Sequence, residues 1–378
     1  MRTAIAAVGK RIRVLIVDDS SVTRRLLAAE LAQDRQIEVV GTAQDPYVAR
    51  DMIRTLSPDV LTLDVQMPGM DGLTFLEKLM RLRPMPVVMV SAFTRKGCET
   101  TLRALELGAV DFVAKPVLRP APGAADGISE LTRKIKAAAK ARLRPVPPAA
   151  PGGSGRLGVA APRSIPPAEY TRLVAVGAST GGTEAIRTLL AEFPAAGPPV
   201  VIVQHMPSQF TGPFAERCDR DCAIRVSEAS DGDEVRPGQA LLAPGDHQMT
   251  VAREGSRLVV RVKRGRAMNR HRPSVDVLFH SVAETVGPRA VGILLTGMGA
   301  DGARGLLAMK TAGSRTIAQD EATSVVFGMP KSAIALGAVD HVLPLARIGR
   351  KALELAASPA PGTPRPALSG GDRDALDG

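Results

Sequence analysis

The fold of the first part of the chain is decided by the stretch IRVLIVDDSSVTRRLLAAELAQDRQIEVVGTA, residues 12–43. Two near-continuous apolar runs, 12–17 and 37–43, flank a segment whose apolar residues recur at helical spacing: Val22, Leu26, Leu27 and Leu31. Apolar runs that alternate with amphipathic segments are typical of a parallel sheet covered by helices on both faces. The stretch therefore predicts a strand, a helix and a second strand.

The same alternation continues to about residue 120. Three further strands are expected at DVLTLD (59–64), PVVMVS (86–91) and VDFVAK (110–115). Five strand-helix units of this length have the size of a small doubly wound domain. The segment 128–143 has the pattern of a helix that closes this domain.

A change of composition then divides the chain. The segment 145–168 is rich in proline and contains Gly-Gly-Ser-Gly, which favours an extended linker with a flexible joint. A second alternating pattern begins with RLVAVG (172–177), and 248–262 resembles a hairpin around Glu254-Gly255. We expect two doubly wound α/β domains with parallel sheets, at 11–144 and 169–356, a linker at 145–168 and a disordered tail at 357–378.

The second domain is expected to contain further strands and helices. The strands are predicted at 199–204, 223–229, 239–244, 290–297 and 314–320. The helices are predicted at 183–192, 275–286, 300–312 and 345–357.

Composition excludes several classes of protein. The 378 residues are 45% hydrophobic and 23% charged, which indicates packed cores rather than global disorder. With no Trp, two Tyr and eight Phe, the chain has few aromatic rings for stacking nucleic-acid bases. The net charge of +11 would suit nucleic acid, an anionic membrane or an acidic protein, and therefore does not choose among them.

The cysteines and the N-terminus bear on the cellular setting. Cys98, Cys218 and Cys222 form neither a disulfide framework nor a complete zinc-ligand set, which favours a reduced, cytoplasmic environment. The first ten residues contain only a short apolar run, so neither a secretory signal nor a membrane span is expected.

Acidic residues follow two strands of the first predicted sheet. Asp18 and Asp19 follow the first strand and Asp64 ends the third, so the three carboxylates are expected at one sheet edge. Three such carboxylates suit Mg²⁺. Ser91 and Lys115 end the next two strands, and a hydroxyl and an ammonium beside Asp64 would stabilise an acyl phosphate. Taken singly, each acid could instead cap a helix or a turn.

These motifs resemble one known family. VDDS (17–20), DVQMPGMDG (64–72), VSA (90–92) and AKP (114–116) resemble the two-component receiver domain over about 115 residues. The resemblance implies a flavodoxin-like fold in which Asp64 accepts the phosphoryl group and Mg²⁺ binds to Asp18, Asp19 and Asp64. It also implies the switch residues, which are Ser91 as the switch hydroxyl, Lys115 as the phosphate-pairing lysine and Phe112 as the switch aromatic.

A serine follows the first strand of the second domain. The sequence Gly177-Ala-Ser179-Thr-Gly181 between a strand and a helix has the pattern of a nucleophile elbow. The alternative is a glycine-rich turn that binds the phosphates of a dinucleotide. Against that alternative, the second strand ends at Gln204-His205 and offers no acidic residue for a ribose.

A histidine and an aspartate are expected at the same edge. His205 follows an apolar strand and could take the proton of Ser179, while Asp301 in a later strand-to-turn element could orient the imidazolium. The chain order Ser, His, Asp differs from the orders of α/β-hydrolases and of the well-known serine proteases, which indicates a convergent triad. Each residue alone is more often structural.

The second domain also resembles a known family. LVAVGASTGG (173–182), VIVQHMP (201–207), LLAPGDHQM (241–249), HRPSVDVLF (271–279) and LLTGMGADG (294–302) resemble the chemotaxis protein-glutamate methylesterase/glutaminase family. Members hydrolyse γ-glutamyl methyl esters, and deamidate certain glutamines, on cytoplasmic helices of chemoreceptors. The resemblance implies a Rossmann-like domain with Ser179 as nucleophile, His205 as general base and Asp301 as the orienting acid, and no cofactor for the esterase.

The oxyanion hole is less well defined by the pattern. Backbone amides near Thr180 and Met298 are the candidates, with packing as the alternative for Met298. His247 and His271 are expected to have structural roles.

We therefore expect a cytoplasmic serine hydrolase in which the unphosphorylated receiver domain restrains the esterase domain. The partners implied are methyl-accepting chemotaxis receptors as substrates and a chemotaxis histidine kinase as phosphodonor, with no nucleic acid and no direct membrane insertion. Two alternatives remain: a response regulator with a DNA-binding second domain, although no helix-turn-helix is apparent, and a dinucleotide-dependent enzyme.

The segment 253–272 carries eight basic residues and one acid, Glu254. It is expected to be a solvated hairpin face, or alternatively a surface that steers an acidic receptor helix.

Overall fold

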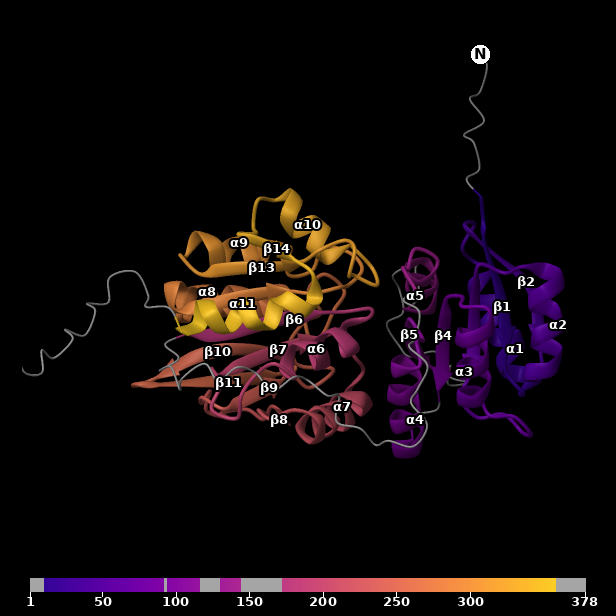
Figure 1. Cartoon of the computed structure of the whole chain (residues 1–378), viewed down its shortest axis with the longest axis horizontal. Helices are drawn as coiled ribbons and strands as arrows, with labels where there is room; N and C mark the ends of the chain where they lie inside the picture. The colour runs from indigo at the N-terminus through magenta and orange to yellow at the C-terminus, as the bar shows by residue number, and fades with distance from the viewer. Residues whose placement is uncertain (1–9, 92–93, 116–129, 144–171, 358–378) are drawn as a thin grey trace, which may run out of the picture.

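The computed structural model describes residues 10–91, 94–115, 130–143 and 172–357. In this part of the chain the strands form two parallel sheets and one separate hairpin. Figure 1 shows the two α/β halves side by side. The predicted linker at 145–168 and the tail beyond 357 lie outside the described residues.

The first half is a five-stranded parallel sheet of order β2-β1-β3-β4-β5. Its strands are β1 (Ile12–Val17), β2 (Ile37–Ala43), β3 (Val60–Asp64), β4 (Val87–Ser91) and β5 (Asp111–Ala114). Its helices are α1 (Ser21–Leu31), α2 (Pro46–Leu56), α3 (Gly72–Leu82), α4 (Arg95–Glu106) and α5 (Glu130–Ala138).

Local sequence explains why these elements form. Strand β1 is apolar on both faces: Leu15 and Val17 pack into one core and Val14 and Ile16 into another. This is the burial expected for a parallel strand between two helical layers. Short polar side chains begin the helices: Ser20 accepts from the amide of Thr23, and similar caps begin α2 and α3 at Asp45 and Asp71.

The second half is a seven-stranded parallel sheet of order β14-β13-β12-β6-β7-β9-β8. Its strands are β6 (Leu173–Ala178), β7 (Val200–Gln204), β8 (Arg225–Glu228), β9 (Gln239–Leu242), β12 (Ala290–Leu294), β13 (Arg315–Gln319) and β14 (His341–Leu343). Its helices are α6 (Gly182–Leu190), α7 (Ser208–Asp221), α8 (Val275–Thr285), α9 (Ala303–Thr311), α10 (Met329–Ala335) and α11 (Leu345–Ala357).

The order of this sheet creates a site. The chain runs from β6 outward through β7 on one side and returns to β12 on the other. At such a switch point the loops after neighbouring strands diverge and leave a crevice at the carboxyl ends of the strands. The separate hairpin, β10 (Gln248–Glu254) and β11 (Arg257–Lys263), turns at Gly255 as expected.

The two doubly wound α/β halves confirm the predicted fold class. The structure also contains α7, α10 and β14, which were not predicted. Helix α7 includes Gly212 and Pro213, a pair that normally argues against a helix. Helix α5 ends at Ala138 instead of 143, with 128–129 outside the described residues. No described helix is long and apolar enough to cross a membrane.

The two halves are in contact. Figure 1 shows α4 and α5 on the side of the first half that faces the second, with α2 on the opposite side. Phe112 of β5 packs on Phe210 of α7 with ring centroids 4.2 Å apart. Glu106, at the end of α4, pairs with Arg187 of α6 and Arg217 of α7. The receiver-like sheet therefore lies against the helices that follow β6 and β7.

Candidate active site

The predicted acidic cluster is present at the carboxyl edge of the first sheet. Carboxylate oxygens of Asp18, Asp19 and Asp64 all lie within 4.8 Å of one another. Asp18 and Asp64 are buried while Asp19 is exposed, so the cluster opens to solvent on one side. Buried carboxylates this close repel one another unless a cation lies between them, and an all-oxygen donor set suits Mg²⁺. These residues therefore fit the metal that receiver domains generally use.

Lys115 lies beside this cluster. Its Nζ is 2.7 Å from Asp64 Oδ2 and 3.0 Å from Asp18 Oδ2. Burial raises the pKa of Asp64, and the hydrogen bond from Lys115 only partly offsets this. For Lys115 itself, burial is outweighed by the two carboxylates, so its pKa is raised and the ammonium form is favoured. Lys115 can therefore place a positive charge beside a group attached to Asp64.

The other two predicted switch residues, Ser91 and Phe112, end or belong to neighbouring strands. Ser91 ends β4, is fully buried, and donates through Oγ to the carbonyl of Gly97 at 3.3 Å. The buried ring of Phe112 packs on Phe210 of the second half, with Lys134 Nζ 4.8 Å from its centroid. Phe112 is thus part of the contact between the two halves.

The turn after β6 presents Ser179 at the edge of the second sheet. The backbone amide of Ser179 donates to the carbonyl of Thr296 at 3.0 Å. Thr296 lies in the loop that follows β12. Gly181 has φ +76, and a Cβ there would lie 2.6 Å from Val325 Cβ. A Cβ on Gly182 would lie 2.1 Å from Gln204 Oε1. Only glycine fits these two positions, so the motif forms the sharp turn that was predicted.

His205 lies between the serine and an aspartate. Its Nδ1 is 3.1 Å from Ser179 Oγ and its Nε2 is 2.8 Å from Asp301 Oδ2. Because a carboxylate only accepts, Nε2 carries the proton and Nδ1 is free to accept from the hydroxyl. The ring is therefore turned over relative to the usual serine-protease arrangement, in which Nε2 faces the serine.

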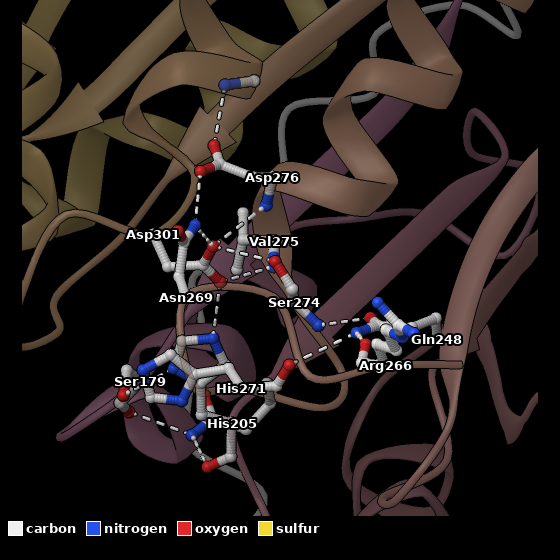
Figure 2. A network of polar contacts seen from close by, with 12 residues as sticks. Ser179, His205, Gln248, Arg266, Asn269, His271, Ser274, Val275, Asp276 and Asp301 are labelled. Carbon is white, nitrogen blue, oxygen red and sulfur yellow. Dashed lines mark hydrogen bonds and ion pairs between the residues drawn. The ribbon is translucent and has the colours of Figure 1, made fainter. Parts of the chain in front are cut away.

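Asp301 is held by several donors at once (Figure 2). The Oδ2 atom accepts from His205 and from the amide of Val275, at 2.7 Å in the latter case. The Oδ1 atom accepts from Ser274 Oγ at 2.8 Å and from Asn269 Nδ2 at 2.7 Å. Burial alone would raise the pKa of Asp301, but these hydrogen bonds and the charge of His205 hold it well below its usual value. The carboxylate is therefore ionised beside the histidine.

A second histidine is stacked on the first. The ring of His271 lies 3.7 Å from that of His205, with an angle of 6° between their planes. Burial, followed by the charge of His205, lowers the pKa of His271 to about 3. His271 is thus a neutral ring stacked on His205, a placement that its position ahead of α8 in the sequence did not reveal. His247 instead contacts the carbonyl of Gly245 through Nδ1 at 3.0 Å.

The residues considered for an oxyanion hole line the same cavity as Ser179. This cavity has a volume of about 340 Å³, and the residues that line it include Thr180, His205, His271 and Met298. The hydroxyl of Thr180 points away to the first half and donates to Asp111 Oδ2 at 2.6 Å. The Thr180 side chain is therefore engaged by the first half.

The other wall of the cavity comes from the first half. Glu130, Arg133 and Lys134 of α5 line it together with Ser179. Lys134 pairs with Asp111 and with Glu130, and these carboxylates raise its pKa despite burial. The first half thus lies over the serine of the second.

The basic segment 253–272 divides into two parts. Arg257 and Arg261 pair with acidic residues of the second half, and Arg272 donates to the carbonyl of Gly265. Arg270 and Arg272 line the cavity. From the end of the hairpin to the cavity, the exposed basic residues are Lys263, which ends β11, then Arg264 and Arg266, and Arg270, which also lines the cavity.

The fold and the site together define the class of protein. It is a response regulator in which a receiver-like first half contacts a second half that carries a hydrolase-like Ser-His-Asp arrangement. Residues 14–121 match the family model of the response regulator receiver domain, and residues 174–352 match that of the CheB methylesterase. The chain belongs to the CheB methylesterase family, and this places its second half among hydrolases rather than DNA-binding or dinucleotide-binding domains.

Curated relatives agree over most of the chain. A protein-glutamate methylesterase/protein-glutamine glutaminase of Bordetella parapertussis is 56% identical over 91% of this chain and 97% of its own length. Proteins of the same name from Thiobacillus denitrificans and Salmonella typhimurium are each 52% identical, over 92% and 91% of this chain and 98% and 96% of their own lengths.

Proposed function

We propose that this chain hydrolyses γ-glutamyl methyl esters, and deamidates glutamines, on the cytoplasmic helices of methyl-accepting chemotaxis receptors, under the control of phosphorylation at Asp64. The observation that supports this most directly is the position of His205 between Ser179 and the ionised Asp301. The names of the relatives indicate the two substrates.

The reaction follows from the roles that the geometry allows. Ser179 Oγ attacks the γ-carbonyl carbon while His205 Nδ1 accepts its proton, and Asp301 stabilises the resulting imidazolium through Nε2. The tetrahedral oxyanion collapses, the imidazolium protonates the leaving methoxide, and methanol departs from an acyl-Ser179. Water then attacks the acyl group with the same base and releases the glutamate. For a glutamine the leaving group is ammonia.

We assign the oxyanion hole to backbone amides at Thr180 and Met298. Both residues line the cavity with Ser179, and Thr180 immediately precedes Gly181, the N-cap of α6, at the helix end that favours negative charge. Neither assignment requires a cofactor in the second half.

In the receiver, Asp64 accepts the phosphoryl group. Asp18, Asp19 and Asp64 would hold Mg²⁺, which when bound neutralises charge on the phosphoryl oxygens. Lys115 pairs with the phosphoryl group, Ser91 supplies the switch hydroxyl and Phe112 acts as the switch aromatic. A chemotaxis histidine kinase is the donor.

The unphosphorylated receiver restrains the esterase. Residues of α5 line the cavity around Ser179, and Asp111 holds the hydroxyl of Thr180, the neighbour of the nucleophile. Phosphorylation relieves this restraint by shifting the contact between the halves.

The remaining assignments concern extent and setting. We place the receiver with its closing helix at 11–144, the linker at 145–168 and the esterase at 169–356, in a cytoplasmic protein. The exposed residues Lys263, Arg264, Arg266 and Arg270 would steer an acidic receptor helix toward the cavity, an effect that added salt weakens.

Methanol release from methylated receptor membranes, with and without a small-molecule phosphodonor, tests this function. Ser179→Ala is expected to abolish methanol release while Asp64 is still phosphorylated, and Asp64→Asn to remove the response to the phosphodonor alone. Wild-type methanol release by Ser179→Ala would overturn the assignment of the nucleophile.

A further inference from the structure

A tight turn beside the cavity brings a fourth side chain to the triad. Residues 268–271 form this turn: Met268 and His271 exchange two backbone hydrogen bonds of 3.0 and 2.8 Å across Asn269 and Arg270. Asn269 and Arg270 both have left-handed backbones, with φ 53 and φ 67. Two consecutive positive φ angles are typical of a type I′ turn, in which asparagine is favoured.

The amide of Asn269 lies between two buried carboxylates (Figure 2). Its Nδ2 donates to Asp301 Oδ1 and to Asp276 Oδ2, each at 2.7 Å. The amide has two N–H groups, so both are used. Asp276 is fixed in turn, because its Oδ1 accepts from the backbone amide of Gly305 in α9 at 2.7 Å.

We propose that Asn269 is a positioning residue of the triad, which holds the carboxylate of Asp301 in the orientation that receives His205 and separates it from the carboxylate of Asp276. The proposal rests on the triad proposed above. Asn269 touches neither Ser179 nor His205 in any contact that the described residues show, so it acts through Asp301.

Charge explains why an amide is needed at this place. The titratable groups around Asp301 are His205, Asp276 and the stacked His271. Burial, with the charge of Asp301 adding to it, raises the pKa of Asp276, whereas hydrogen bonds that include the one from Asn269 lower the pKa of Asp301. A donor shared by both oxygens keeps the two acids from competing for one proton.

The simpler explanation is that Asn269 only serves the turn. Two substitutions separate the explanations. Asn269→Gly accepts the positive φ and removes the amide, and Asn269→Asp keeps the shape and the turn preference but replaces the donor by an acceptor. A role limited to the turn predicts normal activity in both variants.

The test measures methanol release from methylated receptor membranes by the full-length chain in the presence of a phosphodonor. We expect Asn269→Gly to lower kcat by about 10- to 100-fold with KM little changed, the effect of losing one hydrogen bond to a charged group. Asn269→Asp should lose at least as much, because it adds a third carboxyl group beside the two acids. Met268→Ala, in the same turn but 51% exposed, should keep wild-type kcat.

A spectroscopic readout distinguishes positioning from folding. The proton that His205 Nε2 shares with Asp301 should give a far-downfield imidazole resonance in the wild-type ¹H spectrum. It should move or disappear in both Asn269 variants and stay unchanged in Met268→Ala, with unaltered circular dichroism throughout. Wild-type kcat in Asn269→Gly or Asn269→Asp, or an equal loss in Met268→Ala, would overturn the proposal.

Parallel measurements keep the two proposals distinguishable. If Ser179→Ala retained activity, the proposed triad itself would be wrong. If Ser179→Ala is inactive and Asn269→Gly is normal, only the role of Asn269 is refuted.

Discussion

Asp111→Ala should raise the activity of the unphosphorylated enzyme. The carboxylate of Asp111 lies between the two halves. Its Oδ2 accepts from the hydroxyl of Thr180 at 2.6 Å, and its Oδ1 lies 3.1 Å from Lys134 Nζ. The Thr180 contact exists only while the halves are together, so its loss weakens the contact without removing any group from the proposed triad. Separation of the halves would then remove the cavity wall that α5 provides and expose Ser179.

The size of the effect follows from the bond that is lost. A buried hydrogen bond to a charged group contributes about 1.5–3 kcal/mol, and about 1.4 kcal/mol corresponds to a factor of ten in an equilibrium. The fraction of separated enzyme, and with it basal methanol release, should therefore rise about 10- to 100-fold if that fraction is small at the start.

The assay is methanol release without a phosphodonor. Glu77→Ala, an exposed position on α3, is the matched control and should leave basal activity unchanged. The phosphodonor should stimulate Asp111→Ala much less than the wild type. Basal activity equal to that of the wild type, in a variant shown to be folded and phosphorylated normally, would refute the restraint through Thr180.

Three further predictions concern the esterase half. Asp301→Asn replaces the acceptor of the His205 proton and should reduce kcat by roughly 10³- to 10⁴-fold in steady-state assays, with thermal stability measured alongside. Gly181→Ala forces a Cβ to 2.6 Å from Val325 at a left-handed position, so it should cost about 1–3 kcal/mol in chemical denaturation and lower kcat. Burial raises the pKa of the Cys222 thiol to about 11; the thiolate is therefore scarce at pH 8, and iodoacetamide labelling should be slow there and accelerate toward pH 11.

Sequence reasoning located the groups whose positions depend on strand ends. Asp64 ends β3, and Ser179 and His205 directly follow β6 and β7, so their convergence follows from parallel strands sharing one edge. Asp301 belongs to the same set, because the turn that carries it follows β12.

Contacts made by loops far apart in sequence were not predictable in this way. Asn269 reaches Asp301 across 32 positions, and His271 stacks on His205 across about twice that separation in the chain. No periodicity encodes such contacts, since they depend on a turn with two left-handed residues and on where α8 begins. The orientation of the His205 ring was also hidden, because it depends on which side the carboxylate occupies. Asn269 is of a residue type that turns favour, but the sequence indicated no partner for its side-chain amide.

The central place of β6 in its sheet has an evolutionary consequence. The three residues proposed for catalysis follow β7, β6 and β12, which are adjacent, whereas β8 and β14 lie at the two margins of the same sheet. Insertions or exchanges at those margins leave the spacing of Ser179, His205 and Asp301 intact. Changes at the two margins are therefore compatible with an unchanged Ser-His-Asp arrangement at the centre of the sheet.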